Sequence, residues 1–239
     1  MKKLLMLGAM LVVCVPPALA AGQIHLAWND CGSFGSSELN NPCNSNIGSR
    51  MFIGSMIPPS VPQLEGMEGF LDIAEAGPIS PWWRFDAAGC RSGVMTGSFS
   101  FGALPGSCGD PWLGAALGSL LISYPDNANS MFIPGNSERL DIQCAIGTTI
   151  PVDGSQEWYV FEISFARVNT LGPAACSGCN TPTIIYFDEL LLDQPAGSPG
   201  GNSDLTGDGT GQRACYNGAC DNYTPTESRS WGAIKALYH

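Results

Sequence analysis

The chain has 239 residues, of which 21 are acidic and 10 are Lys or Arg, so its formal net charge is −11 at pH 7. An acidic chain repels phosphate backbones and anionic lipid headgroups, which excludes nucleic acid and bare membrane surfaces as expected partners, whereas divalent cations remain allowed. No stretch after residue 20 has about 18 consecutive apolar residues, so the sequence predicts no transmembrane segment.

The N-terminus has the parts of a secretory signal peptide. Two lysines precede an apolar run, and small residues stand at the two positions that signal peptidase reads, which predicts a signal peptide of residues 1–20 cut after Ala20. A lipoprotein cut before Cys14 is the alternative, although Val13 is a poor residue before a lipid-bearing cysteine. The sequence therefore predicts a secreted or cell-surface protein.

The first half of the chain predicts short strands separated by turns. Apolar or alternating segments end at clusters of Gly, Pro and Asn, which are typical turn residues. The predicted strands of this half are residues 23–28, 49–57, 69–74, 79–85 and 93–101.

Residues 156–170 carry a long period-two pattern. Tyr159, Phe161, Ile163 and Phe165 fall on alternate positions, and the stretch contains no Gly or Pro. We expect a central strand of an antiparallel sheet here. The other predicted strands of this half are residues 120–124, 138–146 and 183–192.

The C-terminal part differs in composition. Residues 195–225 are rich in Gly, Ser, Asp and Asn, which predicts a linker after a sandwich domain of residues 21–194. Residues 226–239 predict a short amphipathic helix, which is marginal alone and should dock on another surface. The predicted docking residues are Trp231, Ile234, Leu237 and Tyr238.

Many short strands, regular turn signals and little helix predict the fold class. We expect an all-β, antiparallel two-sheet sandwich of jelly-roll type, with a short C-terminal helix on a Gly-rich tether.

Nine cysteines follow the predicted cleavage site, and a secreted chain of this kind is expected to form disulfides. The predicted local bridges are Cys31–Cys43, Cys90–Cys108 and Cys215–Cys220. Cys144 should face the core and pair with Cys176 or Cys179, which leaves the other as the odd thiol. The C-x-x-C spacing of Cys176 and Cys179 would also suit a redox pair or half a zinc site, but disulfides are the simpler interpretation.

Three short segments carry a resemblance. They are WNDCG at residues 28–32, CSGCNTP at residues 176–182 and WGAIK at residues 231–235. Together they resemble a group of secreted bacterial β-sandwich proteins without an established function. The resemblance implies a secreted sandwich and implies no activity, cofactor or site residue.

The sequence does not favour catalysis. Only His25 and His239 could serve as the base of a hydrolytic triad, and no G-x-S-x-G motif is present. Glu162, Asp188 and Glu189 on predicted strands are candidate acids of a glycosidase. Solvated positions on the outer face of a sheet are the simpler interpretation of these acids.

Two kinds of ligand site remain as hypotheses. Asp204, Thr206 and Asp208 match the first half of a calcium loop, although Cys215 stands where its last acid belongs. We therefore expect no cofactor, with weak calcium binding as the alternative. The second hypothesis is a platform of planar rings that stack on sugars, whereas core or edge packing is the simpler interpretation for each ring. Its candidate residues are Trp82, Trp83 and Trp112, and we expect one of the adjacent pair to face outward.

The sequence as a whole favours a secreted or surface-attached protein with a binding or structural role and no catalysis. The expected partner is an extracellular polysaccharide or an envelope protein. A sandwich-type glycan-active enzyme using Glu162 and Asp188 is one alternative. A subunit of an extracellular filament, which would use the odd cysteine and the terminal helix, is the other.

Overall fold

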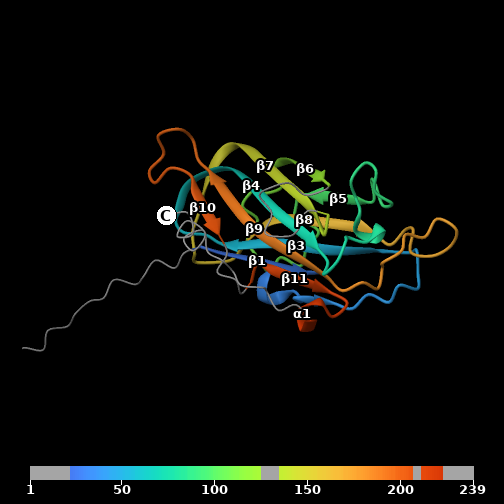
Figure 1. The fold of residues 1–239 in the computed structure, drawn as a ribbon. Helices are drawn as coiled ribbons and strands as arrows, with labels where there is room; N and C mark the ends of the chain where they lie inside the picture. Colours follow the sequence, from blue (N-terminus) through green and yellow to red (C-terminus); the bar gives the residue numbers. More distant parts are fainter. Residues whose placement is uncertain (1–21, 125–134, 207–210, 223–239) are drawn as a thin grey trace, which may run out of the picture.

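The computed structural model describes residues 22–124, 135–206 and 211–222 and folds them into two β-sheets, A and B (Figure 1). The strands of sheet A are β1 (Gln23–Trp28), β3 (Ser49–Ile57), β5 (Met95–Ser98) and β8 (Trp158–Ala166). The strands of sheet B are β2 (Glu38–Leu39), β4 (Val61–Ala74), β6 (Leu117–Ser123), β7 (Ser137–Val152), β9 (Thr183–Asp193), β10 (Ser203–Thr206) and β11 (Arg213–Tyr216). The other elements are two 3-10 helices, η1 (Gly32–Phe34) and η2 (Pro81–Trp83), and the short helix α1 (Ala219–Asn222).

The predicted antiparallel sandwich is confirmed. Sheet A has the strand order β1-β3-β8-β5, and sheet B has the order β2-β11-β9-β4-β7-β6 with β10 paired to β9. Among the described strand pairs, only β2 and β11 run parallel. Strand β6 pairs with β7, β5 with β8 and β4 with β9, so the pairs are nested around the β6–β7 connection. Nested pairs shared between two sheets are the connectivity of a jelly roll.

The predicted central strand lies inside sheet A as β8, between β3 and β5. Its alternate residues Tyr159, Phe161, Ile163 and Phe165 are all buried. The ring of Phe161 contacts the ring of Phe187 in sheet B, with 5.6 Å between centroids. Burial of one such side chain stabilises a fold by roughly 1.5–3 kcal/mol, so this strand organises the core.

The predicted strand at residues 79–85 is wrong, because η2 lies there instead. Trp82 and Trp83 are both fully buried, whereas neighbouring residues of a strand point to opposite faces. A 3-10 turn allows both rings to enter the core. The N–H of Trp82 donates to the carbonyl of Ser177 at 2.9 Å, so a loop contact replaces a sheet hydrogen bond.

The prediction of a linker at residues 195–225 is wrong where the structure describes the strands β10 and β11. Both β10 and β11 pair with β9, and Leu205, Ala214 and Tyr216 are buried. A Gly-rich turn at residues 194–202 connects β9 to β10, and β10 and β11 both extend sheet B. The predicted signal peptide and the predicted C-terminal docking residues lie outside the described residues.

Three of the four disulfides join parts of the chain that are far apart in the sequence. The bonded pairs are Cys31–Cys108, Cys43–Cys179, Cys90–Cys176 and Cys215–Cys220, and Cys144 is a free, buried thiol. The predicted Cys215–Cys220 bridge is therefore present, and the inward direction of Cys144 is confirmed. The predicted pairs Cys31–Cys43 and Cys90–Cys108, and the predicted pairing of Cys144 with Cys176 or Cys179, are wrong. The chain crosses repeatedly between the sheets, so distant loops meet at the ends of the sandwich.

Candidate functional site

Two loops meet at the end of the sandwich where β3 begins and β8 ends. The Asn46 carboxamide oxygen accepts hydrogen bonds from the N–H groups of Thr170 and Leu171, at 2.9 and 2.8 Å. Its amide nitrogen donates to the carbonyl of Leu171 at 3.1 Å. These bonds fix loop 40–48 against loop 167–182, and we call the surface of the two loops the loop face. It lies at the right-hand end of the ribbon view (Figure 1).

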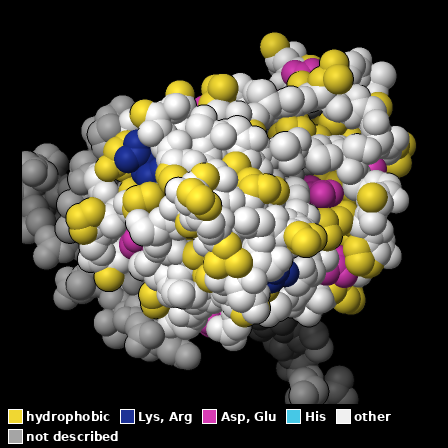
Figure 2. Space-filling view, turned by 90° about the vertical axis from the view of Figure 1, so that its right-hand side faces the viewer, with side chains coloured by type: hydrophobic (Ala, Val, Ile, Leu, Met, Phe, Trp, Pro, Cys, Tyr) yellow, Lys and Arg dark blue, Asp and Glu magenta, His cyan; other side chains and the backbone are white. Residues whose placement is uncertain are grey.

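The loop face carries exposed aliphatic side chains. Ile47 is 83% exposed, Leu171 is 46% exposed and Val168 is 40% exposed. Figure 2 views this end of the molecule and shows many hydrophobic side chains with few acidic ones between them.

A groove of about 580 Å³ opens on the loop face. It is lined by Cys43, Thr170 and the segment 175–182, and none of these side chains is charged. The segment is bonded at Cys176 and Cys179 to two other loops, so two disulfides form the groove wall. The lining groups are small, neutral and rich in hydroxyl and amide groups.

The local sequence explains why segment 176–179 turns so sharply. Gly178 has a φ of +98°, and a Cβ there would lie 2.2 Å from the side chain of Ser80. Glycine is the residue that adopts this backbone conformation at least cost. Because Cys176 and Cys179 each have a distant disulfide partner, neither forms a redox pair or a zinc site with the other.

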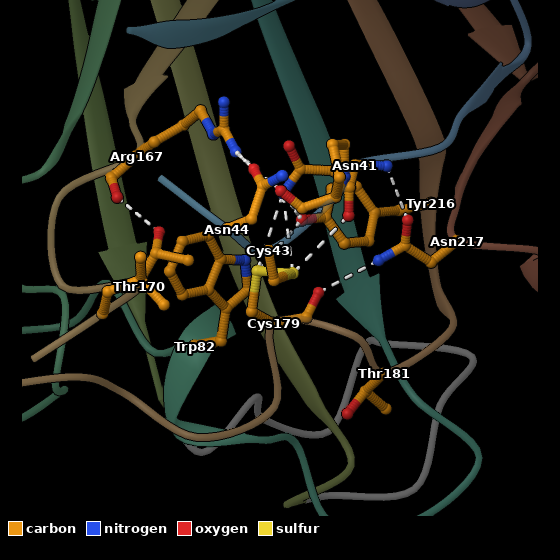
Figure 3. The surroundings of a disulfide bond; sticks show 12 residues. Asn41, Cys43, Asn44, Trp82, Arg167, Thr170, Cys179, Thr181, Tyr216 and Asn217 are labelled. Atoms are coloured by element: carbon orange, nitrogen blue, oxygen red, sulfur yellow. Dashed lines mark hydrogen bonds between the residues drawn. A yellow bond between two sulfur atoms is a disulfide. The ribbon is translucent and has the colours of Figure 1, made fainter. Parts of the chain in front are cut away.

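A chain of hydrogen bonds leads from the Arg50 guanidinium through Asn41 to the Cys43–Cys179 disulfide. Figure 3 shows Asn41, Tyr216 and the disulfide. Arg50 donates twice to the Asn41 carboxamide oxygen, at 2.9 and 2.6 Å. The Asn41 amide nitrogen donates to the Tyr216 hydroxyl and also lies 3.6 Å from Cys179 Sγ and 3.7 Å from Cys43 Sγ. The Tyr216 hydroxyl lies 3.7 Å from Cys179 Sγ.

The hydroxyl of Tyr216 acts as a donor in this network. Burial raises the pKa of Tyr216, which keeps the hydroxyl protonated at neutral pH. A disulfide sulfur carries no proton, so the hydrogen bond at Cys179 runs from the hydroxyl to the sulfur.

Two further arginines lie around this site. The buried Arg91 guanidinium stacks on Trp82, 3.6 Å from the ring centroid, and donates to the carbonyls of Trp82 and Ala166. Burial lowers the pKa of Arg91 to about 10, so the group stays charged at neutral pH. Arg167 donates to the carbonyl of Pro42 at 2.7 Å. In the part of the chain that the structure describes, no carboxylate pairs with either guanidinium.

A separate polar cluster surrounds Glu157, just before β8. His25 Nδ1 and the Ser55 hydroxyl each lie 2.6 Å from the same oxygen of Glu157. Burial opposes the ionisation of this carboxyl, but hydrogen bonds from His25 and Ser55 outweigh burial and hold the pKa of Glu157 below its usual range. Serine and histidine both bond the acid here, which is not the serine–histidine–acid order of a hydrolytic triad.

The WNDCG segment helps to build this cluster. Gly32 has a φ of +46°, and a Cβ there would lie 2.1 Å from the Glu157 carboxylate. Asp30 accepts from the Ser107 hydroxyl at 2.7 Å and from the Tyr159 hydroxyl at 3.3 Å. The motif therefore fixes a loop against β8.

The three predicted ligand-binding tryptophans do not form a surface. Trp82, Trp83 and Trp112 are all fully buried, so none of them presents a ring face to a sugar. The expectation that one ring of the adjacent pair points outward is wrong. The predicted platform fails because all three rings contribute to the core.

The predicted glycosidase acids lie on opposite sides of the molecule. Glu162 alternates on β8 with the buried Phe161 and Ile163, so it points outward from sheet A. Asp188 on β9 pairs with Arg139 of β7 at 2.9 Å on the outer side of sheet B. Glu162 and Asp188 therefore cannot act together on one glycosidic bond.

The predicted calcium ligands are described only in part. Asp204 and Thr206 belong to β10, on either side of the buried Leu205, and Asp208 lies outside the described residues. In residues 22–124, 135–206 and 211–222, no group of three or more His, Cys, Asp or Glu side chains is placed to hold a metal ion. In the same residues, no helix is long and apolar enough to cross a membrane.

Sequence reasoning missed the residues that make the loop face. Ile47 and Leu171 stand singly in loops of Gly, Ser and Asn, where no periodic pattern singles them out. Asn41 and Arg50 lie beside the Cys43–Cys179 bond, whose two cysteines are 136 residues apart in the sequence, and local spacing cannot reveal such a pair. Only the CSGC segment gave a signal, because its two cysteines are close together.

Comparison with known proteins adds little to this geometry. No protein-family model and no curated protein matches the chain. A solved structure with some similarity is the cohesin module from a family 33 glycoside hydrolase of Clostridium perfringens ATCC13124, at 7% identity and a TM-score of 0.32. The match covers 78% of this chain and 96% of the cohesin module. A similarity of this size carries no argument about function.

Proposed function

We propose that this chain is a secreted or surface-attached β-sandwich that binds a partner protein through its loop face and has no catalytic role. The observation that carries the proposal is the set of exposed aliphatic side chains on loops that are fixed in place. Ile47, Val168 and Leu171 are exposed on loops held by Asn46 and by two disulfides.

The physical case rests on preorganisation. A binding surface loses affinity when its loops must become ordered on contact, and cross-linked loops avoid much of that cost. Exposed aliphatic side chains on such a surface supply apolar area that a partner can bury. Removal of apolar area from water has a favourable transfer free energy of about 25 cal/mol per Å².

The disulfides support an oxidising compartment. Eight cysteines form four bonds, and such bonds persist outside the cytosol. The predicted signal peptide agrees with that location. An envelope or extracellular protein is therefore the partner class that we propose.

A polysaccharide is the other partner that the sequence suggests. The hydroxyl and amide groups of the groove would suit neutral sugars, but the three candidate stacking rings are buried. The exposed aliphatic groups favour a protein surface instead. The two partner classes are separate outcomes of the same experiment.

The test compares substitutions of exposed aliphatic residues on the loop face with a substitution of an exposed aliphatic residue elsewhere. Ile47 and Leu117 are each 83% exposed, and Leu117 lies outside the loop face, at the start of β6 in sheet B. We expect Ile47→Ser with Leu171→Ser to weaken binding to a purified envelope partner roughly tenfold or more. Leu117→Ser should leave the Kd unchanged.

The partner would first be captured from a cell-surface extract and then purified for titration calorimetry. Equal Kd values for the two variants would contradict the proposed face. Retention of the wild type on insoluble polysaccharide, with no protein captured, would replace the protein partner by a glycan.

A further inference from the structure

The Cys43–Cys179 disulfide differs from the other three in the groups that surround its sulfur atoms. We propose that it is a thiol-exchange site, at which an external thiolate attacks Cys43 and releases Cys179. This inference is independent of whether the loop face binds a partner.

The reaction balances without another reagent. The S–S bond between Cys43 and Cys179 breaks, and a new S–S bond forms between the sulfur of the attacking thiolate and Cys43. The electron pair of the broken bond stays on Cys179 Sγ. The attacking sulfur is oxidised to the mixed disulfide, and Cys179 is reduced to a thiolate.

Access sets which sulfur is attacked. Both cysteines line the groove, but Cys43 is partly exposed, whereas Cys179 is buried. A small thiolate therefore reaches Cys43 from the solvent side. Cys179 is then the leaving group.

The leaving sulfur is placed among hydrogen-bond donors. The Asn41 amide nitrogen lies 3.6 Å from Cys179 Sγ, and the Tyr216 hydroxyl lies 3.7 Å from it (Figure 3). Arg50 holds the Asn41 oxygen with two hydrogen bonds, which turns the amide nitrogen toward the two sulfur atoms and the Tyr216 hydroxyl. Donors aimed at a sulfur stabilise its thiolate, and a more stable thiolate leaves faster.

Positive charge around the same site adds to this effect. Arg50 and Arg91 both interact electrostatically with Tyr216, whose hydroxyl contacts Cys179. Nearby cations favour a thiolate over a thiol.

Among the described residues, the sulfur atoms of the other three disulfides lack such a network of side-chain donors. In the Cys31–Cys108 bond, Cys31 is fully buried, and its own N–H bonds the Asp30 carboxylate at 2.8 Å, so the adjacent charge is negative. Cys90 is exposed and its partner Cys176 is buried, but among the described residues no side-chain donor contacts the Cys176 sulfur. Access alone would favour the opening of Cys90–Cys176, whereas the donor network favours the opening of Cys43–Cys179.

The test follows the order in which the disulfides open in the folded protein. The full chain is incubated with reduced glutathione without denaturant, quenched with acid, alkylated and mapped by mass spectrometry. We expect the first species to carry glutathione on Cys43 and an alkyl group on Cys179. First opening of the Cys90–Cys176, Cys31–Cys108 or Cys215–Cys220 bond would overturn the proposal, and this readout needs no variant.

A matched pair of variants tests the donor network. Tyr216→Phe removes one hydroxyl from a buried ring, and we expect the Cys43–Cys179 bond to open about three- to tenfold more slowly, as suits the loss of one hydrogen bond. Tyr159→Phe removes the hydroxyl of another buried ring, which bonds Asp30, and should leave that rate unchanged. The Cys90–Cys176 rate in each variant is the internal control. An unchanged Cys43–Cys179 rate in Tyr216→Phe would overturn the role of the network.

Discussion

Glu138 is a carboxyl group in the core of the sandwich. It is fully buried, and its two oxygens both accept from the N–H of Phe85, at 2.8 and 3.0 Å. Burial raises the pKa of Glu138 to about 8, and the nearby Asp86 also raises it. The group is therefore mainly protonated at neutral pH in the folded protein, whereas it is ionised in the unfolded chain.

This difference predicts how stability depends on pH. Between about pH 4.5 and about pH 8 the folded state binds more protons than the unfolded state. The contribution of Glu138 to the free energy of unfolding is therefore fully present below pH 4.5 and is lost as the pH rises through 8. The loss is at most about 1.4 kcal/mol per pH unit. Glu138→Gln cannot ionise, so urea unfolding measured from pH 5 to 8 should show a flatter dependence than in the wild type. Parallel curves for the two proteins would contradict the buried protonated state.

Cys144 is the odd cysteine on which the alternative of a filament subunit depends. Burial raises the pKa of its thiol to about 12, and Cys144 is the free cysteine of the described residues. A buried, protonated thiol reacts slowly with other thiols and disulfides. The odd cysteine therefore gives no support to a subunit joined to its neighbours by disulfides.

At the scale of elements, the CSGC turn offers a controlled comparison. Gly178 and Gly172 have similar left-handed φ values, +98° and +91°, but only Gly178 would place a Cβ against another side chain. Gly172→Ala should cost about 1 kcal/mol from backbone strain alone. Gly178→Ala should cost more, because Ser80 must also move.

Thermal or urea unfolding of both variants measures the difference. Equal losses of stability would show that the contact with Ser80 relaxes at no cost. A larger loss in Gly178→Ala would show that this turn is held rigidly against η2.

Local pattern was sufficient for some elements and insufficient for others. The predicted bounds of β1 and β3 agree with the structure, because alternation within each segment is a local property. Strands β4 and β7 run well beyond their predicted ranges, through bulges that shift the β4 pairing at Leu64 and Gly66. Bulges break the period-two pattern on which strand prediction depends.

Other features could not be found from local pattern at all. Strands β10 and β11 have four residues each and depend on pairing with β9, so their composition alone resembles a linker. The disulfide partners depend on which loops the sheet crossovers bring together. The loop face was missed for the same reason, because Ile47 and Leu171 meet only in the folded chain.

At the scale of the whole molecule, the disulfides constrain loops of very different length. Cys43–Cys179 spans 136 residues and Cys215–Cys220 spans 5. A longer closed loop removes more entropy from the unfolded chain, by an estimate of about 5 kcal/mol for the first bond and about 2 kcal/mol for the second.

Two double variants test this difference in stability, one with Cys43 and Cys179 and the other with Cys215 and Cys220 replaced by alanine. We expect both to retain the sandwich in near-UV circular dichroism, because one core of this size is large enough to fold without them. The Cys43/Cys179 variant should lose more stability in urea than the Cys215/Cys220 variant. The reverse order would show that contacts in the folded state, and not chain entropy, set the contribution of these bonds.

The nested strand order also has a consequence for a chain that enters an oxidising space N-terminus first. Cys31 and Cys43 emerge together, yet their partners Cys108 and Cys179 follow much later in synthesis. Early oxidation would join the two neighbours in a non-native bond. Correct pairing then requires that oxidation wait for the sheets or that bonds be reshuffled, which takes seconds to hours. Under the proposed secretion, folding of this chain is therefore expected to depend on disulfide isomerase, because three of its four bonds join distant cysteines.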